Sequence, residues 1–139
     1  MSNDIKIELD TARLDMLKAG IPERAENILE AAARRIETRA KESMKGGSTG
    51  AGRDARGRFT KGSHVPSAPG EPPHVDTGAL RSSIHVEQNK PMTRDIMDGV
   101  EYGIHLEFGT TRMEARPWLT PAVNTEREPL TQAWKELCR

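Results

Sequence analysis

The sequence predicts an α+β domain, in which a small antiparallel sheet is packed by a long helix from the N-terminal half and by a C-terminal helix. Three observations predict this class. One apolar stripe recurs at helical spacing, short segments alternate between apolar and polar residues, and a long glycine- and proline-rich stretch separates them. With 139 residues the chain has room for a single domain, 1–139, divided into 1–44, an arm at 45–75, and 76–139.

The N-terminal part predicts one strand and two helices. Residues 5–9 alternate between apolar and charged side chains, which is typical of a half-buried strand, and residues 10–17 can form a short helix. Pro22 suits the first turn of the long helix, and Gly46 and Gly47 end it. The apolar stripe of this helix is Ala25, Ile28, Leu29, Ala32, Ile36, Ala40 and Met44.

Residues 45–75 predict a protruding arm. Eleven of these 31 residues are Gly or Pro, and the only large apolar side chains are Phe59, Val65 and Val75. So little apolar surface does not offset an ordering entropy of about 1–2 kcal/mol per residue. We therefore expect the arm to be flexible or to become ordered on a partner, with 63–73 extended and 46–62 mobile.

The remaining residues predict a hairpin, a corner and a helix. Residues 76–81 form a capped turn, and 83–87 and 95–100 read as strands of a hairpin, which the N-terminal strand could extend. A short helix should follow at 102–108 and end at Gly109. Thr120 before Pro121 starts the C-terminal helix, with Val123, Leu130, Trp134 and Leu137 on one face. Pro129 should kink that helix or divide it in two.

Charge argues against a dedicated nucleic-acid binder, because lysines plus arginines and aspartates plus glutamates both number 21. The charge is nevertheless uneven, with balances of −3, +6 and −3 over residues 1–33, 34–62 and 63–139. The basic middle includes four arm residues that could follow a phosphate backbone or dock on an acidic protein surface, with Phe59 available to stack on a base: Arg53, Arg56, Arg58 and Lys61.

No residue pattern points to catalysis, a metal or a cofactor. His74 with Asp76, and His105 with Glu107, could each give two metal ligands, but a site needs three or four. The single cysteine, Cys138, is a poor nucleophile candidate so close to the end of the chain. No segment is apolar enough to span a membrane and no secretory signal pattern is present, so we expect a non-enzymatic protein made in a cytosol.

Two motifs carry a resemblance to a known family. Residues 76–84 resemble a "TG-x-L-R-x-S-I" signature, and residues 102–122 resemble "YA-x-x-x-EFGT … A-x-PF-L-x-PA". In this order after a long helix they resemble the gene-product-ten-like tail-component family of long-tailed bacteriophages and prophages, over about residues 22–137. The motif positions are Thr77, Gly78, Leu80, Arg81, Tyr102, Glu107, Phe108, Gly109, Thr110, Arg116, Pro117, Trp118 and Pro121. This chain departs from the pattern with Gly103 in place of alanine and Trp118 in place of phenylalanine.

The resemblance implies a structural virion protein at the neck, a tail-completion or head–tail connector subunit. It implies a homo-oligomeric ring, which we take to be a hexamer, assembled in the host cytoplasm with connector, stopper, terminator or tail-tube proteins and close to packaged DNA. The alternative is a DNA-contacting accessory protein that uses the basic arm, residues 53–61.

The residues of the second motif favour the same interpretation, since they suit shape rather than proton transfer. Gly109 permits a positive φ, Pro117 and Pro121 fix the chain direction, and Phe108, Trp118 and Leu119 offer packing surface. Two roles remain open for Glu107: an ion pair with Arg116, within or between subunits, or an acceptor that caps backbone N–H groups.

Overall fold

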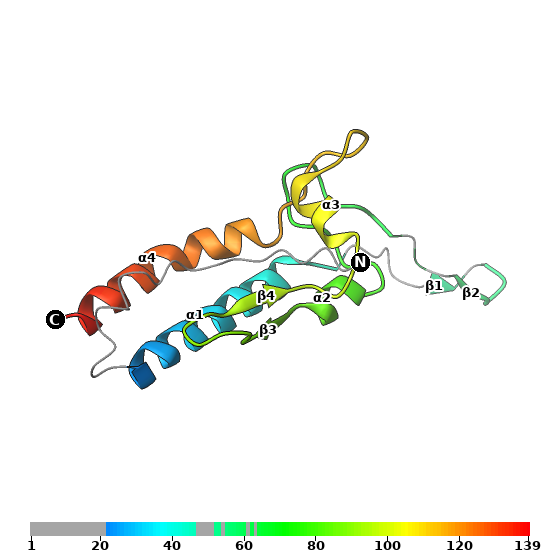
Figure 1. Cartoon of the computed structure of the whole chain (residues 1–139). Coiled ribbons are helices and arrows are strands. Elements are labelled where there is room, and N and C mark those ends of the chain that lie inside the picture. The colour runs from blue at the N-terminus through cyan, green and yellow to red at the C-terminus, as the bar shows by residue number, and fades with distance from the viewer. Residues whose placement is uncertain (1–21, 47–51, 54, 61, 63) are drawn as a thin grey trace.

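A computed structural model describes residues 22–46, 52–53, 55–60, 62 and 64–139. Three elements carry most of the fold: helix α1 (Pro22–Ser43), helix α4 (Thr120–Leu137), and the hairpin of β3 (His85–Glu87) and β4 (Asp95–Met97). Helix α1 lies between α4 and the hairpin (Figure 1). This is the predicted α+β class: α1 packs against the small antiparallel sheet, and α4 packs against α1 rather than against the sheet itself. The predicted strand at 5–9 and helix at 10–17 lie outside the described residues.

Helix α1 follows its predicted stripe closely. Ala25, Leu29, Ala32, Ile36 and Ala40 are buried, and so is Met44 just beyond the helix end. The small alanines let α4 approach along the length of α1, and Figure 1 shows the two helices side by side.

The central core forms where the C-terminal half of α1 meets the hairpin, α2 (Ala79–Ser83) and the start of α4. Its buried members are Ile36, Ala40, Met44, Leu80, Ile84, Ile96, Trp118, Leu119 and Ala122. Motif residues from both ends of the 76–122 region therefore share one apolar cluster.

The hairpin is antiparallel as predicted, with Val86 opposite Ile96, but its strands are shorter than expected. Ser83 belongs to α2, because the turn at 76–81 continues into a helical turn whose N-cap is Gly78 at φ 83°. The prediction of strand at 83–84 and 98–100 was wrong. Alternation alone does not separate a strand from a short helix that enters it.

An ion-pair cluster ties the hairpin to the N-terminal half of α1. Arg94 is only 7% exposed, and its guanidinium lies 2.7 Å from the carboxylates of both Glu26 and Glu30. The backbone N–H of Met92 also donates to Glu26 (2.7 Å). We call Arg94, Glu26 and Glu30 the hairpin clamp. It fixes the loop between β3 and β4 on α1.

Helix α4 is continuous through Pro129, so of the two effects predicted for this proline, a kink or a division, the division does not occur. Pro129 lies on the exposed side, while Glu126 and Leu130 on either side of it are buried against the rest of the molecule. Glu126 is 2% exposed and accepts hydrogen bonds from Arg35 (2.7 Å) and Arg39 (2.9 Å) of α1. This packing holds the helix together where the proline removes one backbone bond.

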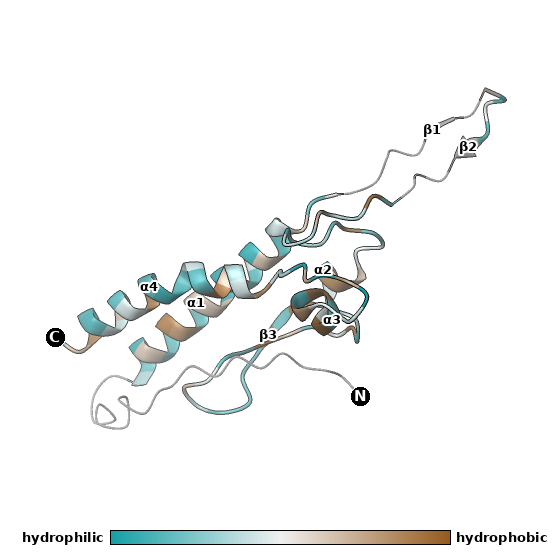
Figure 2. Cartoon of the chain, turned by 90° about the horizontal axis from the view of Figure 1, so that it is seen from above, coloured by the Kyte–Doolittle hydropathy of each residue, from teal (hydrophilic) through white to brown (hydrophobic). Residues whose placement is uncertain are grey.

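The outer part of the arm contains a two-stranded hairpin, β1 (Gly52–Arg53) with β2 (Phe59–Thr60), which projects beyond the helices (Figure 2). The inner part, 64–75, makes backbone hydrogen bonds to the rest of the chain. Val75 donates its N–H to the carbonyl of Lys45 (2.7 Å), and Gly70 donates to that of Ala115 (2.9 Å). The low apolar content of residues 64–75 does not indicate this attachment. It depends on backbone hydrogen bonds, and Ser67 and Pro73 are buried within the segment.

Candidate assembly site

The second motif forms a sharp corner between α3 (Gly103–Phe108) and α4. We call residues 103–120 the corner. Its central side chain is Glu107, which leaves α3 on the inner side and is 4% exposed. One carboxylate oxygen accepts the N–H groups of Trp118 (2.8 Å) and Leu119 (2.9 Å), and the other accepts that of Thr120 (2.9 Å). Glu107 thus satisfies two N–H groups at the helix start, those of Leu119 and Thr120, and that of Trp118 just before it.

The capping role of Glu107 also suits the charge of that position. The N-terminus of a helix carries a partial positive charge, so a carboxylate is stabilised there even without a cation. Of the two roles left open for Glu107, the structure of the single chain shows the second, in which Glu107 accepts hydrogen bonds from backbone N–H groups. Within the chain Arg116 turns elsewhere, and its Nε donates to the carbonyl of Ser67 (3.1 Å) at the base of the arm.

Trp118 locks the other side of the corner. It is 1% exposed, and its indole N–H donates to the carbonyl of Gly103 (3.1 Å), so both its ring and its polar atom are satisfied. Gly103 leaves room for the buried carboxylate of Asp98, which would have to shift if this position carried a Cβ. The glycine that departs from the family pattern is therefore explained by a buried aspartate in the preceding loop.

Gly109 makes the turn itself. It has φ 76° and ψ 179°, a conformation that side chains rarely adopt, and an added Cβ would lie 2.8 Å from Ala115 N and Met113 O. Thr110 and Met113 then close a small loop, with Thr110 N donating to the Met113 carbonyl (2.7 Å). Arg116 N returns the chain to α3 by donating to the Leu106 carbonyl (2.6 Å).

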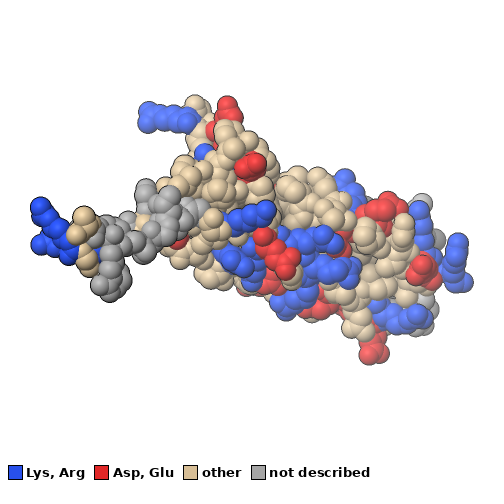
Figure 3. Space-filling model, turned by 180° about the vertical axis from the view of Figure 1, so that it is seen from behind, with Lys and Arg blue, Asp and Glu red and all other residues tan. Residues whose placement is uncertain are grey.

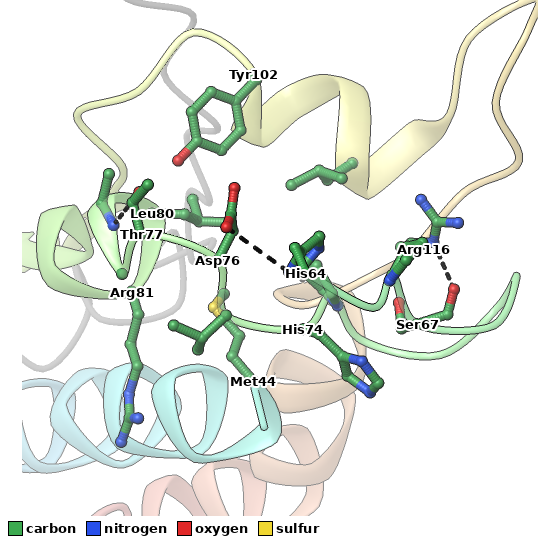
Figure 4. A pocket seen from close by; sticks show the side chains of 16 residues that line it. Met44, His64, Ser67, His74, Asp76, Thr77, Leu80, Arg81, Tyr102 and Arg116 are labelled. Carbon is green, nitrogen blue, oxygen red and sulfur yellow. Dashed lines mark hydrogen bonds and ion pairs between the residues drawn. The ribbon is translucent and has the colours of Figure 1, made fainter. Parts of the chain in front are cut away.

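The two motifs meet at a pocket of about 380 Å³ between α3 and the 64–81 segment. Figure 4 shows Tyr102 on one side and Asp76, Thr77 and Leu80 facing it from the other, while Arg81 points away along α1. Met44, Val75 and Leu106 add apolar lining, and His64, His74 and Arg116 lie at the side of the arm. Sequence reasoning named the members of both motifs but not this meeting, which depends on tertiary packing.

Three large hydrophobic side chains are exposed among the described residues: Val65 (45%), Tyr102 (45%) and Phe108 (66%). The prediction that Phe108 offers packing is therefore not met inside the chain, in contrast to Trp118 and Leu119. Tyr102 lines the pocket, and Val65 lies between two pocket residues, His64 and Pro66. Pro117 is partly buried, whereas Thr110 and Pro121 are exposed.

In the two predicted histidine–carboxylate pairs, Glu107 and His74 make other hydrogen bonds. Glu107 is committed to backbone N–H groups and is not available beside His105, and His74 Nδ1 lies 2.8 Å from the Val65 carbonyl. His64 lies 3.9 Å from Asp76. Over the part of the chain that the structure describes, no group of three or more potential ligands that could hold a metal is found. Nor does any described helix have the length and apolarity to cross a membrane.

The basic residues of the sequence's middle part, 34–62, fall into two groups. Those on α1 are largely paired with acids: Arg34 with Glu30 and Glu37, and Lys41 with Glu37. Arg56 and Arg58 are exposed at the outer end of the arm, where Figure 3 shows Lys and Arg atoms far from the body. The side chains of Arg53 and Lys61 lie outside the described residues. The basic middle of the sequence is therefore not one continuous surface.

Several side chains that build this structure were missed from sequence: Arg94, Asp98 and Glu126. For Glu126 a signal existed, since it lies four residues from both Ala122 and Leu130 on the apolar face of α4. Its burial works against its charge, yet hydrogen bonds from Arg35 and Arg39 outweigh this and lower the pKa of the carboxyl. Arg94 lies at the end of the β3–β4 loop and Asp98 directly after β4, and neither belongs to a periodic apolar pattern that would have indicated its burial.

Fold and corner together define a small α+β protein whose motif residues maintain backbone shape and join secondary-structure elements. Residues 11–109 match the family model described as "Bacteriophage HK97-gp10, putative tail-component". The match spans more than half of the chain, so the protein belongs to the HK97-gp10-like family of bacteriophage tail components. It ends at Gly109, so the second half of the corner lies beyond it. No curated protein and no solved structure matches the chain.

Proposed function

We propose that this protein is a tail-completion or head–tail joining subunit that forms a closed ring, a hexamer, at the neck of a tailed phage particle. Membership of a tail-component family supports the general role, and the corner supports the specific one. The buried Glu107 carboxylate is used internally to hold the backbone shape, and the corner presents Phe108 outward. A rigid corner with an exposed aromatic side chain is suited to docking on another protein.

In this role the protein acts by complementary surfaces and catalyses no reaction. Its place would be the virion neck, beside connector, stopper, terminator or tail-tube proteins, after assembly in the host cytoplasm. A ring requires each copy to use two different surfaces, because only a head-to-tail contact closes around an axis of more than two copies.

The test is to image particles from a phage that carries the gene with a small C-terminal tag. Density for the tagged subunit in a sixfold ring between head and tail tube is expected. A phage lacking the gene should accumulate filled heads and free tails that do not join. Tagged subunit found only at the distal tail tip, or joined particles without the gene, would contradict the proposal.

A second function, DNA contact through the arm, is favoured by the basic outer end of the β1–β2 hairpin (Figure 3). In that case the purified chain should bind duplex DNA with an affinity that falls steeply as salt rises. Deleting residues 46–62 distinguishes the two functions. Loss of DNA binding with intact rings supports DNA contact, whereas loss of particle joining with unchanged DNA retention supports docking.

A further inference from the structure

Opposite faces of α3 differ in a way that suits a contact between copies. Tyr102 and Leu106 are one turn apart and both line the pocket. Phe108 follows Leu106 by two residues, and at about 100° per residue it leaves the helix about 200° away from it. Figure 2 shows the apolar colouring of α3 extending around the helix. One short helix thus carries a recess on one side and an exposed aromatic side chain on the other.

We propose that Phe108 of one copy inserts into the pocket of the next copy, between Tyr102, Leu80 and the 64–81 segment. This inference rests on the proposed function, because it names the ring contact that the function requires. The contact is head-to-tail, since a recess and a protruding side chain are different surfaces. Such contacts close into rings when the rotation between copies allows it.

Size supports this occupant. A cavity of roughly 150 Å³ is enough to hold a benzene ring, and the pocket measures about 380 Å³. Its apolar lining includes Met44, Leu80 and Leu106, with which a phenyl ring can make contact. A side chain that is 66% exposed in the free chain would become buried, and apolar burial is the main favourable term in association.

Charge supports it as well. The loop after Phe108 exposes one cation and one anion, Arg112 and Glu114. The pocket is lined by the exposed Asp76, whose charge is opposite to that of Arg112, whereas the exposed Arg81 points away from the pocket (Figure 4). A neighbouring copy therefore meets a compatible charge beside the apolar contact, which fixes orientation more than it adds affinity.

Site-directed cross-linking tests the contact. Cys138 is the single cysteine, so Cys138→Ser gives a cysteine-free chain for the full-length protein. In that background one preparation carries Phe108→Cys and a second carries Ala79→Cys, an exposed pocket residue. Under mild oxidation, disulfide-linked dimers are expected from the mixture and not from either preparation alone. A chain with both substitutions should give a ladder of linked multimers.

Other outcomes overturn the inference in distinguishable ways. Dimers from Phe108→Cys alone would show a symmetric contact. Linkage of Ala79→Cys to Arg58→Cys in place of Phe108→Cys would assign the pocket to the arm of the neighbour. Sedimentation of the cysteine-free chain as an oligomer without these cross-links would place the ring contact elsewhere and leave the proposed function standing. A cysteine-free chain that stays monomeric would remove the self-contact itself, while particle imaging separately decides the neck role.

Direct measurement of association gives a second readout. Phe108→Ser should weaken self-association at least about tenfold in sedimentation, whereas Phe108→Leu, which keeps an apolar side chain, should weaken it less. Asn124→Ala, on an exposed face of α4, is the matched control and should leave association unchanged. Equal association of the Phe108→Ser chain and the control would overturn the inference.

Discussion

The corner and the hairpin clamp both fix a loop by means of carboxylates, but with different partners. In the corner, Glu107 is 4% exposed and its partners are backbone N–H groups at the start of α4. In the clamp, Arg94 is buried but its partners Glu26 and Glu30 are 26% and 40% exposed. The corner therefore depends on geometry within a dry site, and the clamp depends on charges that water and salt partly screen.

This difference matches what each region does. The clamp attaches the hairpin loop to α1 and needs only to keep the sheet in place. In the contact that we propose, the corner presents Phe108 in a fixed direction, and an acceptor that holds three successive N–H groups leaves little freedom of orientation. We expect substitutions in the corner to be costly and insensitive to salt, and those in the clamp to be smaller and salt-dependent.

The largest effect is expected for Glu107→Ala. It leaves three N–H groups at the α4 start without acceptors, two of them on fully buried residues. The free energy of unfolding should fall by about 3 kcal/mol or more, measured by urea denaturation. Glu107→Gln keeps one oxygen acceptor and should recover part of this loss. Equal stability of the alanine and wild-type chains would show that the cap does not hold the corner.

Arg94→Ala should come next. It removes the cation between Glu26 and Glu30, and the free energy of unfolding should fall by about 2 kcal/mol, less than for a fully buried pair because both glutamates reach solvent. The loss should shrink in 1 M salt, whereas that of Glu107→Ala should not. Arg94→Lys, which keeps the charge without the two-sided geometry, is the control. A salt-independent loss for Arg94→Ala would remove the distinction between the two regions.

The corner and the hairpin clamp also show which structural features could be predicted from the sequence. Elements with a repeating apolar pattern were predicted well: α1, the β3–β4 hairpin and the short helix that ends at Gly109. Each depends on neighbours in the chain. The two roles of Glu107 could be named from sequence but not chosen between, because the choice depends on where α4 begins in space. Arg94 was missed since its partners lie 64 residues or more away in the chain.

Tertiary contacts also determine two features that local sequence preference does not decide, the continuity of α4 and the attachment of the inner arm. Pro129 does not divide α4, because Glu126 and Leu130 hold the helix on α1. The inner arm is ordered despite its low apolar content, because Arg116 and Ala115 from the corner bond to its backbone. In both cases the residues that stabilise the segment lie far from it in the sequence, so no local sequence pattern predicts the contact.

Gly109→Ala tests whether the backbone conformation and close packing at the corner contribute to stability. The new Cβ would be strained by φ 76° and would lie 2.8 Å from two backbone atoms, so a loss of about 2 kcal/mol is expected by thermal unfolding. Gly70→Ala is the matched control, since Gly70 has φ 83° with open space around it. It should cost about 1 kcal/mol. Equal losses for the two would mean that close packing at the corner contributes nothing.

Acid should weaken the clamp. Hydrogen bonds from Arg94 and then Arg34 hold the pKa of Glu30 below its usual value of 4.5. A carboxyl with a lowered folded-state pKa contributes stability above the unfolded pKa, and this is lost as pH falls through the folded one. The difference between wild type and Arg94→Ala should therefore be largest near pH 7 and diminish below pH 4.5, as followed by urea unfolding. Gly109→Ala, which changes no charge, should show a constant difference, and a parallel decline there would contradict this assignment.

Phe108→Ser should have the smallest effect on the single chain. Phe108 is adjacent to Glu107 in the same motif, yet its side chain is 66% exposed, so little apolar area is lost from the folded monomer when it is shortened. At protein concentrations low enough to keep the chain monomeric, the free energy of unfolding should change by less than about 0.5 kcal/mol. The contrast with Glu107→Ala is then at its sharpest, since two neighbouring motif positions would differ several-fold in their contribution to folding. A large loss for Phe108→Ser in the monomer would show that the side chain stabilises its own chain, and its exposure would no longer indicate a partner.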